Sequence, residues 1–151
     1  MAVEYRNDLP DRDAYFALFE STGWNREYRM RPEQLREAVR GSWHMVNAYA
    51  DGKLIGTGRV ISDGVFHALI VDVVVAPQFQ GQGIGTAIAE RLLAVCRAAS
   101  LVDVQLFCAK GNAPFYRRLG FVERGADAPG MDYRQTQIAR SATAGPSGRA
   151  R

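Results

Sequence analysis

The fold is decided by residues 71–86, which read Val-Asp-Val-Val-Val-Ala-Pro-Gln-Phe-Gln-Gly-Gln-Gly-Ile-Gly-Thr. The stretch begins as an apolar, β-branched run, breaks at Ala76-Pro77, crosses a polar turn with glycines at alternate positions and enters a helical pattern. It predicts a strand that leads through a glycine loop into a helix. Because a helix N-terminus presents unpaired N–H groups and the positive end of the helix dipole, the loop predicts a phosphate site. The alternative is a tight turn that needs glycine only for its dihedral angles.

The segments on either side of this stretch predict an α+β fold. Apolar positions at helical spacing predict helices over residues 11–21, 32–41, 83–99 and 112–119. Alternating or continuous apolar runs predict strands near Tyr5 and over residues 43–50, 53–61, 67–75, 101–107, 121–123 and 131–138. The Asp51-Gly52 turn predicts a hairpin, and the strand after the helix of residues 83–99 is expected to run parallel to the strand before it.

The glycine loop does not fit the two common phosphate-binding fingerprints. A dinucleotide-binding pattern should follow the first strand of a βαβ unit, and a P-loop should end in Gly-Lys-Ser/Thr. Here the loop lies past the middle of the chain and lacks that ending. It resembles instead the acyl-CoA pyrophosphate loop of the GNAT superfamily of N-acetyltransferases, Gln/Arg-x-x-Gly-x-Gly/Ala, which Gln80, Gly83 and Gly85 match in register.

A second stretch resembles the same superfamily. Residues 112–121 read Asn-Ala-Pro-Phe-Tyr-Arg-Arg-Leu-Gly-Phe, which is similar to its downstream signature. The amino-acid sequences of both stretches are similar to those of small bacterial GNAT enzymes and of plastid-type serotonin N-acetyltransferases. The resemblance implies a mixed, mostly antiparallel sheet of about six or seven strands flanked by about four helices. In it, a splayed pair of parallel strands forms the cofactor crevice.

The resemblance also implies acetyl-CoA as co-substrate, with no metal. The expected cofactor-binding residues are those of the strand end, the glycine loop and the downstream signature. They are Val73, Val74, Val75, Gln80, Gly81, Gln82, Gly83, Ile84, Gly85, Thr86, Asn112 and Phe115. Main-chain N–H groups of residues 73–75 would bind the pantetheine amides and polarise the thioester carbonyl.

Acetyl transfer to an amine needs an unprotonated amine, donors at the developing oxyanion and a proton for the departing thiolate. The resemblance makes Tyr116 the candidate proton donor, and the alternative is that Tyr116 packs under Phe121. Asp72 is a carboxylate in an apolar strand, where burial is costly unless the charge is paired. It is a candidate base or amine ligand, or else a structural charge paired with an arginine such as Arg59.

The acceptor is less defined than the donor. Trp24 and Tyr28 lie in an aromatic and polar loop, where they either line a substrate pocket or pack the loop down. The resemblance favours a small primary amine, such as an arylalkylamine, as acceptor in a ternary complex. The alternatives are a protein lysine or N-terminal acetyltransferase and a non-catalytic acyl-CoA-binding module. A homodimer is expected by analogy with such folds.

Composition predicts one globular domain over residues 1–138 and a disordered tail over residues 139–151, since the tail has nothing to bury. The net charge of +3 equals the three arginines of that tail, so the remaining residues balance and we expect no nucleic-acid partner. No apolar run reaches the length of a membrane span, and the N-terminus lacks a signal-peptide layout, which predicts a cytoplasmic protein. Cys96 and Cys108 have no metal-site spacing.

Overall fold

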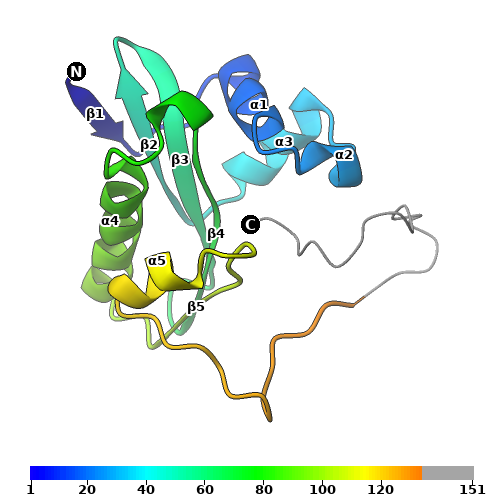
Figure 1. The fold of residues 1–151 in the computed structure, drawn as a ribbon, viewed down its shortest axis with the longest axis vertical. Helices are drawn as coiled ribbons and strands as arrows, with labels where there is room; N and C mark the ends of the chain where they lie inside the picture. Colours follow the sequence, from blue (N-terminus) through cyan, green and yellow to red (C-terminus); the bar gives the residue numbers. More distant parts are fainter. Residues whose placement is uncertain (134–151) are drawn as a thin grey trace. The chain divides into compact units, whose positions relative to one another are not determined.

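The computed structural model describes residues 1–133, which divide into one compact unit over residues 1–106 and a second from residue 107 onward. Figure 1 labels the elements of both units. The first unit contains β1 (Val3–Arg6), α1 (Arg12–Glu20), α2 (Asn25–Tyr28), α3 (Pro32–Arg40), β2 (His44–Ala50), β3 (Lys53–Ser62), β4 (His67–Val75), the 3-10 helix η1 (Pro77–Phe79), α4 (Ile84–Ala98) and β5 (Asp103–Leu106). The second unit contains α5 (Ala113–Arg118). The prediction of one domain over residues 1–138 stays a prediction.

The five strands of the described residues form one sheet in the order β1-β2-β3-β4-β5. The first four are antiparallel neighbours, and β5 pairs with β4 in parallel, as its position after a crossover helix predicts. The β2–β3 hairpin turns through Asp51 and Gly52, which have φ of 47° and 74° and so adopt the two positive dihedrals of a type I′ turn. The mixed α+β architecture is confirmed.

The number of strands is lower than the six or seven expected. Residues 121–123 are not a strand, because Val122 is 90% exposed and Glu123 makes a local ion pair with Arg117 at 2.7 Å. Such a segment buries too little apolar surface to extend a sheet. Residues 131–133 are also not a strand, and the rest of that expected strand lies outside the described residues, as does the expected tail of residues 139–151.

One α-helix of the described residues, α2, was not expected. α2 is a single turn that forms where the sequence predicts a loop, since four residues are too few to show a helical period. The Asn25 side chain closes it: its Nδ2 donates to the Met30 carbonyl at 3.0 Å and its Oδ1 accepts from the Met30 N–H at 2.7 Å. The segment then reverses at Arg29, whose φ is 51°.

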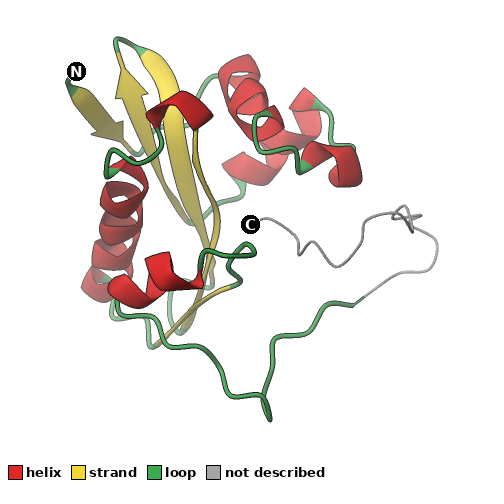
Figure 2. Cartoon of the chain, in the orientation of Figure 1, coloured by secondary structure: helices red, strands yellow, loops and turns green. Residues whose placement is uncertain are grey.

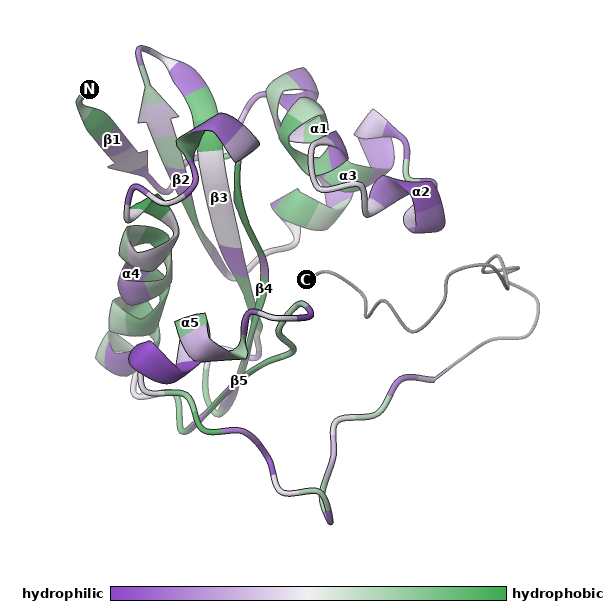
Figure 3. Cartoon of the chain, in the orientation of Figure 1, coloured by the Kyte–Doolittle hydropathy of each residue, from purple (hydrophilic) through white to green (hydrophobic). Residues whose placement is uncertain are grey.

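The sheet is covered on both faces, by α4 on one side and by α1 and α3 on the other (Figure 2). Most of β4 has the colour of hydrophobic residues in Figure 3. Ile84, Ile88 and Leu92 of α4 are at most 3% exposed. On the opposite face, Tyr15, Phe19, Leu35, Val39 and Met45 form a second buried cluster.

Gly56 and Gly58 lie on the α4 face of β3, where the absence of side chains lets the helix approach closely. A Cβ on Gly58 would lie 2.8 Å from Ile88 Cγ2 and 2.9 Å from Leu92 Cδ1. We therefore expect Gly58→Ala to lower the free energy of unfolding by about 1–3 kcal/mol, because the helix must shift outward. Urea denaturation measures this value.

The matched control is Gly41→Ala, where the added Cβ would meet its neighbours at 3.5 and 3.7 Å, which are ordinary contacts. Gly41 has φ of −76°, which alanine adopts without strain. Its replacement is expected to leave stability unchanged or to raise it by about 0.4–1 kcal/mol. If Gly58→Ala and Gly41→Ala lower the free energy of unfolding equally, the close approach of α4 to β3 does not cause the loss of stability.

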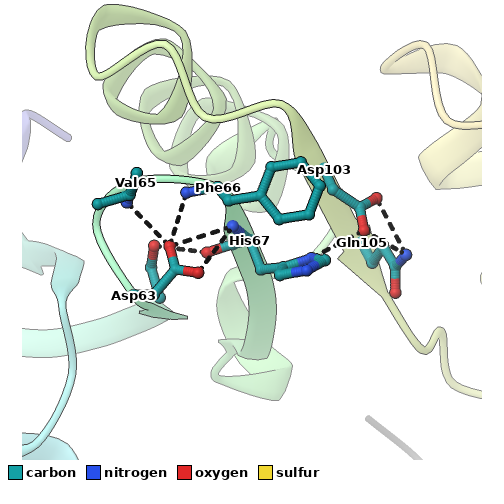
Figure 4. Close-up of polar contacts among 7 residues, drawn as sticks. Asp63, Val65, Phe66, His67, Asp103 and Gln105 are labelled. Atoms are coloured by element: carbon teal, nitrogen blue, oxygen red, sulfur yellow. Dashed lines mark hydrogen bonds and ion pairs between the residues drawn. The ribbon is translucent and has the colours of Figure 1, made fainter.

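The turn between β3 and β4 sets the start of the parallel pair (Figure 4). Asp63 Oδ1 accepts from the N–H groups of Val65, Phe66 and His67 at 2.8, 2.7 and 3.1 Å. These backbone donors, that of Phe66 first, hold the pKa of Asp63 below its usual value. His67 Nδ1 then lies 2.9 Å from Asp103 Oδ2, across the first pair of the β4–β5 ladder. The pairing register is thereby fixed at its N-terminal end.

Candidate functional site

The C-terminal half of β4 has an edge without a strand partner in the first unit. The β4–β5 pairing ends at Ile70 and Leu106, whereas β4 continues to Val75. The Ala76 N–H donates to Ile55 on β3 at 2.8 Å, and Val75 lies opposite Gly56. Because backbone groups alternate in direction along a strand, Val73 and Val75 point their N–H groups away from β3. Val74 points toward β3, so its N–H is directed into the sheet.

A β-bulge lies at the start of this edge. Arg59 pairs with Val71 and Thr57 pairs with Val74, so two residues of β4, Asp72 and Val73, lie opposite Gly58. Asp72 has φ of 54°, in the left-handed region that glycine usually occupies in such a bulge. The bulge bends β4 at the point where its pairing with β5 ends.

The glycine loop joins this strand to α4. η1 leads from β4 to Gln80, whose Nε2 donates to the free carbonyl of Val75 at 2.9 Å. Gln82 donates to the Gln78 carbonyl at 3.3 Å. Gly81 and Gly83 have φ of 73° and 79°, and a Cβ at either would meet no atom of residues 1–133 within 4 Å. These glycines are therefore required for their dihedral angles, and the space beside them is open.

The N-terminus of α4 has free backbone donors. The Ala87 N–H makes the first intrahelical bond, to Gly83 at 3.0 Å, so the N–H groups of Ile84, Gly85 and Thr86 precede the helical ladder. Among the described residues no side chain caps this end. A 15-residue helix adds the positive end of its dipole. The donor set suits a diphosphate, whose oxygens accept hydrogen bonds from several N–H groups.

Asp72 does not lie free in the strand. Its Oδ2 accepts from Arg59 Nε at 2.7 Å, and the two side chains are 19% and 14% exposed. Of the alternatives that the sequence leaves open, the structure contains the ion pair with Arg59. A role for Asp72 as base or amine ligand stays a prediction.

Tyr15 is a residue of this site that sequence reasoning missed. It is buried beside Arg59 and Asp72, and burial, followed by the Asp72 charge, raises the pKa of its hydroxyl above the usual value. The sequence shows Tyr15 only as one apolar position of α1. The available signal was its hydroxyl, which needs a polar partner when a tyrosine is buried.

Trp24 and Tyr28 lie on the side of the sheet that α1 and α3 cover. Phe19 contacts both, with ring centroids at 5.8 Å from Trp24 and 6.5 Å from Tyr28. Trp24 also packs against the cluster of Leu18, Val74 and Ala76, next to the end of β4. Its Nε1 is buried and has no hydrogen-bond partner within residues 1–133. Both side chains therefore pack the loop down, and their role toward a substrate stays a prediction.

The second unit holds Asn112, Phe115 and Tyr116. Asn112 precedes α5, and Tyr116 packs edge-on against Phe115 at 4.9 Å and Phe121 at 5.8 Å. Burial, followed by the nearby Cys108, raises the pKa of Tyr116 to about 12. The packing alternative for Tyr116 is thus present in the structure. The phenol also stays protonated at neutral pH, as a proton donor requires.

Two further findings concern the described residues. Within residues 1–133 no three His, Cys, Asp or Glu side chains gather as metal ligands would. No described helix combines the length and the apolar character that crossing a bilayer requires.

Comparison with curated proteins finds N-acetyltransferases. The chain is 33% identical over 119 residues to the uncharacterized N-acetyltransferase ycf52 of Pyropia yezoensis, covering 76% of this chain and 66% of that protein. It is 38% identical over 97 residues to chloroplastic serotonin N-acetyltransferase 2 of Oryza sativa subsp. japonica, covering 62% and 48%. It is 34% identical over 117 residues to histone acetyltransferase TAP1 of Glycine max, covering 70% and 49%. The chain thus spans about half to two thirds of the length of these relatives.

Solved structures share the fold. A Staphylococcus aureus protein described as a probable acetyltransferase has a TM-score of 0.77 at 28% identity, covering 89% of this chain and all of that one. The PaiA N-acetyltransferase of Thermoplasma acidophilum, solved in complex with coenzyme A, has a TM-score of 0.66 at 17% identity, covering 82% and 92%. The second likeness is one of fold alone.

The family comparison covers most of the chain. Residues 9–121 match the family described as Acetyltransferase (GNAT) family. This range includes β4, the glycine loop, α4 and the segment of Tyr116. The chain belongs to the GNAT family of acetyltransferases.

Proposed function

We propose that the chain is an acetyl-CoA-dependent N-acetyltransferase that acts on a small primary amine, such as an arylalkylamine. The observation that carries the proposal is the continuity of two sets of backbone donors. Val73 and Val75 point N–H groups to an edge that has no strand partner in the first unit, and the start of α4, which no described side chain caps, follows after eight residues. Pantetheine amides and a diphosphate need these two sets of donors in this order.

The proposed reaction is direct transfer in a ternary complex. The uncharged amine nitrogen attacks the thioester carbonyl carbon, the new C–N bond forms and the C–S bond breaks. Main-chain N–H groups of the β4 edge stabilise the developing oxyanion. The thiolate accepts the phenolic proton of Tyr116, and the amine proton passes to water or to a base. The PaiA structure with coenzyme A supports this choice of co-substrate.

Part of the proposal is that the partly buried aromatic groups on the α1 and α3 side of the sheet also contact a small, apolar amine. Phe16, Trp24 and Tyr28, with Met30, are partly buried against the core cluster around Phe19. A planar apolar amine suits such surroundings, because aromatic contacts favour its ring. The serotonin N-acetyltransferase relative supports this class. A cytoplasmic location and a homodimer remain part of the proposal.

A protein acceptor is the second candidate, because the histone acetyltransferase relative matches more of this chain than the serotonin enzyme does. The test is a screen for free thiol release with acetyl-CoA and four acceptor classes: arylalkylamines, polyamines, amino acids and lysine peptides. Turnover of arylalkylamines at least tenfold above peptides is expected. The reverse order would favour the protein acetyltransferase.

Acetyl-CoA binding, measured together with turnover, distinguishes an enzyme from a non-catalytic acyl-CoA-binding module, the third alternative. Acetyl-CoA at millimolar concentration is expected to raise the melting temperature relative to CoA-free buffer. Stabilisation without turnover of any acceptor class would favour a non-catalytic acyl-CoA-binding module. Absence of stabilisation would contradict both the enzyme and the binding module.

A further inference from the structure

We propose that Asp72 is a positioning residue, which with Arg59 fixes the β4 bulge and so aims the N–H groups of Val73 and Val75 at the acyl-CoA. This inference rests on the proposed function. It assigns to Asp72 a role that involves no proton transfer. It also makes Arg59 part of the acyl-CoA site, although Arg59 does not itself touch the ligand.

The first step is the bulge itself. Asp72 adopts φ of 54°, and the register shifts between Thr57 and Arg59, with Gly58 alone opposite two β4 residues. Aspartate is one of the few residues with a side chain that adopt this conformation, and it does so at a cost that glycine does not have, so surrounding contacts are needed to fix it there. The bulge determines the direction of every backbone group that follows it up to Val75, because those groups alternate from that point.

The second step is the contact that holds it. Arg59 lies directly after Gly58 on β3, and its Nε donates to Asp72 Oδ2 at 2.7 Å. The same guanidinium donates through Nη1 to the Ala38 carbonyl at 3.2 Å and to Ser42 Oγ at 3.3 Å. Arg59 therefore connects the bulge to α3, on the side of the sheet that carries the candidate acceptor residues.

The third step is the surroundings of the pair. Arg59 and Asp72 are 14% and 19% exposed, whereas the side chains of the Arg12–Glu33 pair, which joins α1 to α3, are 46% and 63% exposed. A shielded pair is weakened less by water and salt than a surface pair. The buried Tyr15 of α1 lies beside the pair. Removal of one partner would leave the other buried and uncompensated, and the bulge would lose its fixed position.

The experiment measures CoA affinity by calorimetry and the hydrogen exchange of the β4 amides. Asp72→Ala and Arg59→Met are each expected to weaken CoA binding about tenfold and to speed exchange at Val73 and Val75. The double variant should lose no more than the single variants, because both remove the same contact. Arg12→Met is the matched control and should bind CoA as the wild type does.

Two further variants at position 72 separate positioning from the alternatives. Asp72→Asn keeps an oxygen for Arg59 and tolerates positive φ, so it should stay within about threefold of wild type in CoA affinity and in kcat. Asp72→Gly removes the carboxylate, but glycine adopts the positive φ freely, which offsets part of the loss of the ion pair. It should therefore fold with near-normal thermal stability and still bind CoA about tenfold more weakly.

Several outcomes would overturn the inference. If Asp72→Asn and Asp72→Ala both lose 100-fold or more in kcat with CoA affinity intact, and the acidic limb of the pH profile disappears, Asp72 is a base. If Asp72→Ala and Asp72→Gly bind CoA like wild type, the ion pair does not position the edge. Wild-type protein that fails to bind CoA would instead contradict the proposed function, so the two failures are distinguishable.

Discussion

Gly83→Asp is expected to weaken acetyl-CoA affinity by about 100-fold, which corresponds to about 2.7 kcal/mol. The residue directly precedes α4, and a Cβ there meets no atom of residues 1–133 within 4 Å, so the new side chain has room beside the free N–H groups of Ile84, Gly85 and Thr86. A carboxylate in that position repels the diphosphate and competes with it for the helix N-terminus. Isothermal titration with acetyl-CoA measures the loss.

The control for this prediction is Gly83→Asn. Asparagine has nearly the same size and tolerates positive φ as well as aspartate does, so both variants share the backbone strain. Their thermal stabilities should therefore agree, while the affinity of the asparagine variant should fall less than tenfold. If both variants lose affinity equally, the effect comes from the backbone and the loop does not bind the diphosphate through charge.

Tyr116→Phe is expected to lower kcat by about 100- to 1,000-fold with little change in the KM for acetyl-CoA, because it removes only the proton for the thiolate. Phenylalanine keeps the edge-on packing against Phe115 and Phe121, so the fold should persist. Tyr133→Phe is the matched control, since Tyr133 is 86% exposed in the same unit. Steady-state kinetics with an amine identified by the screen provides the measurement.

The pH profile gives an independent check on Tyr116. Burial raises the pKa of Tyr116 to about 12, so the phenol keeps its proton throughout the range in which most amines lose theirs. Wild-type kcat/KM should therefore rise with pH as the amine deprotonates. It should show no decrease at any pH up to 10. A descending limb between pH 8 and 10, or unchanged turnover in Tyr116→Phe, would contradict the role as proton donor.

The sequence predicts best where a local pattern determines the structure. The apolar run of residues 67–75 matches β4 in both bounds, and the helix predicted over residues 11–21 is α1, Arg12–Glu20. The start of α1 is predictable because Asp11 caps it: Asp11 Oδ1 accepts from the N–H groups of Asp13 and Ala14 at 3.0 and 2.9 Å. Caps and turns of this kind involve only a few neighbouring residues, so they can be predicted from a short stretch of sequence.

What the sequence could not predict depends on contacts between distant residues. The bulge at Asp72 is a mismatch of register with β3, and periodicity within one strand carries no information on register. The sequence does show the Asp72 carboxylate as unusual in an apolar strand, with Arg59 as one possible partner. It does not show that Tyr15 lies beside both, because that contact depends on how α1 packs on the sheet. The expected strand at residues 121–123 failed for a related reason, since strand-forming residues build a sheet only where a partner edge exists.

The bulge in β4 has a second consequence, for solubility. A straight, unpaired strand edge is a template on which another polypeptide can add as an extra strand, and natural sheets protect such edges with bulges and charged side chains. Here the bulge interrupts the edge at Asp72, and the Gln80 side chain already occupies the Val75 carbonyl. An incoming chain therefore finds neither a straight ladder nor a full set of acceptors at this edge of the first unit, so the bulge disfavours strand-to-strand aggregation there.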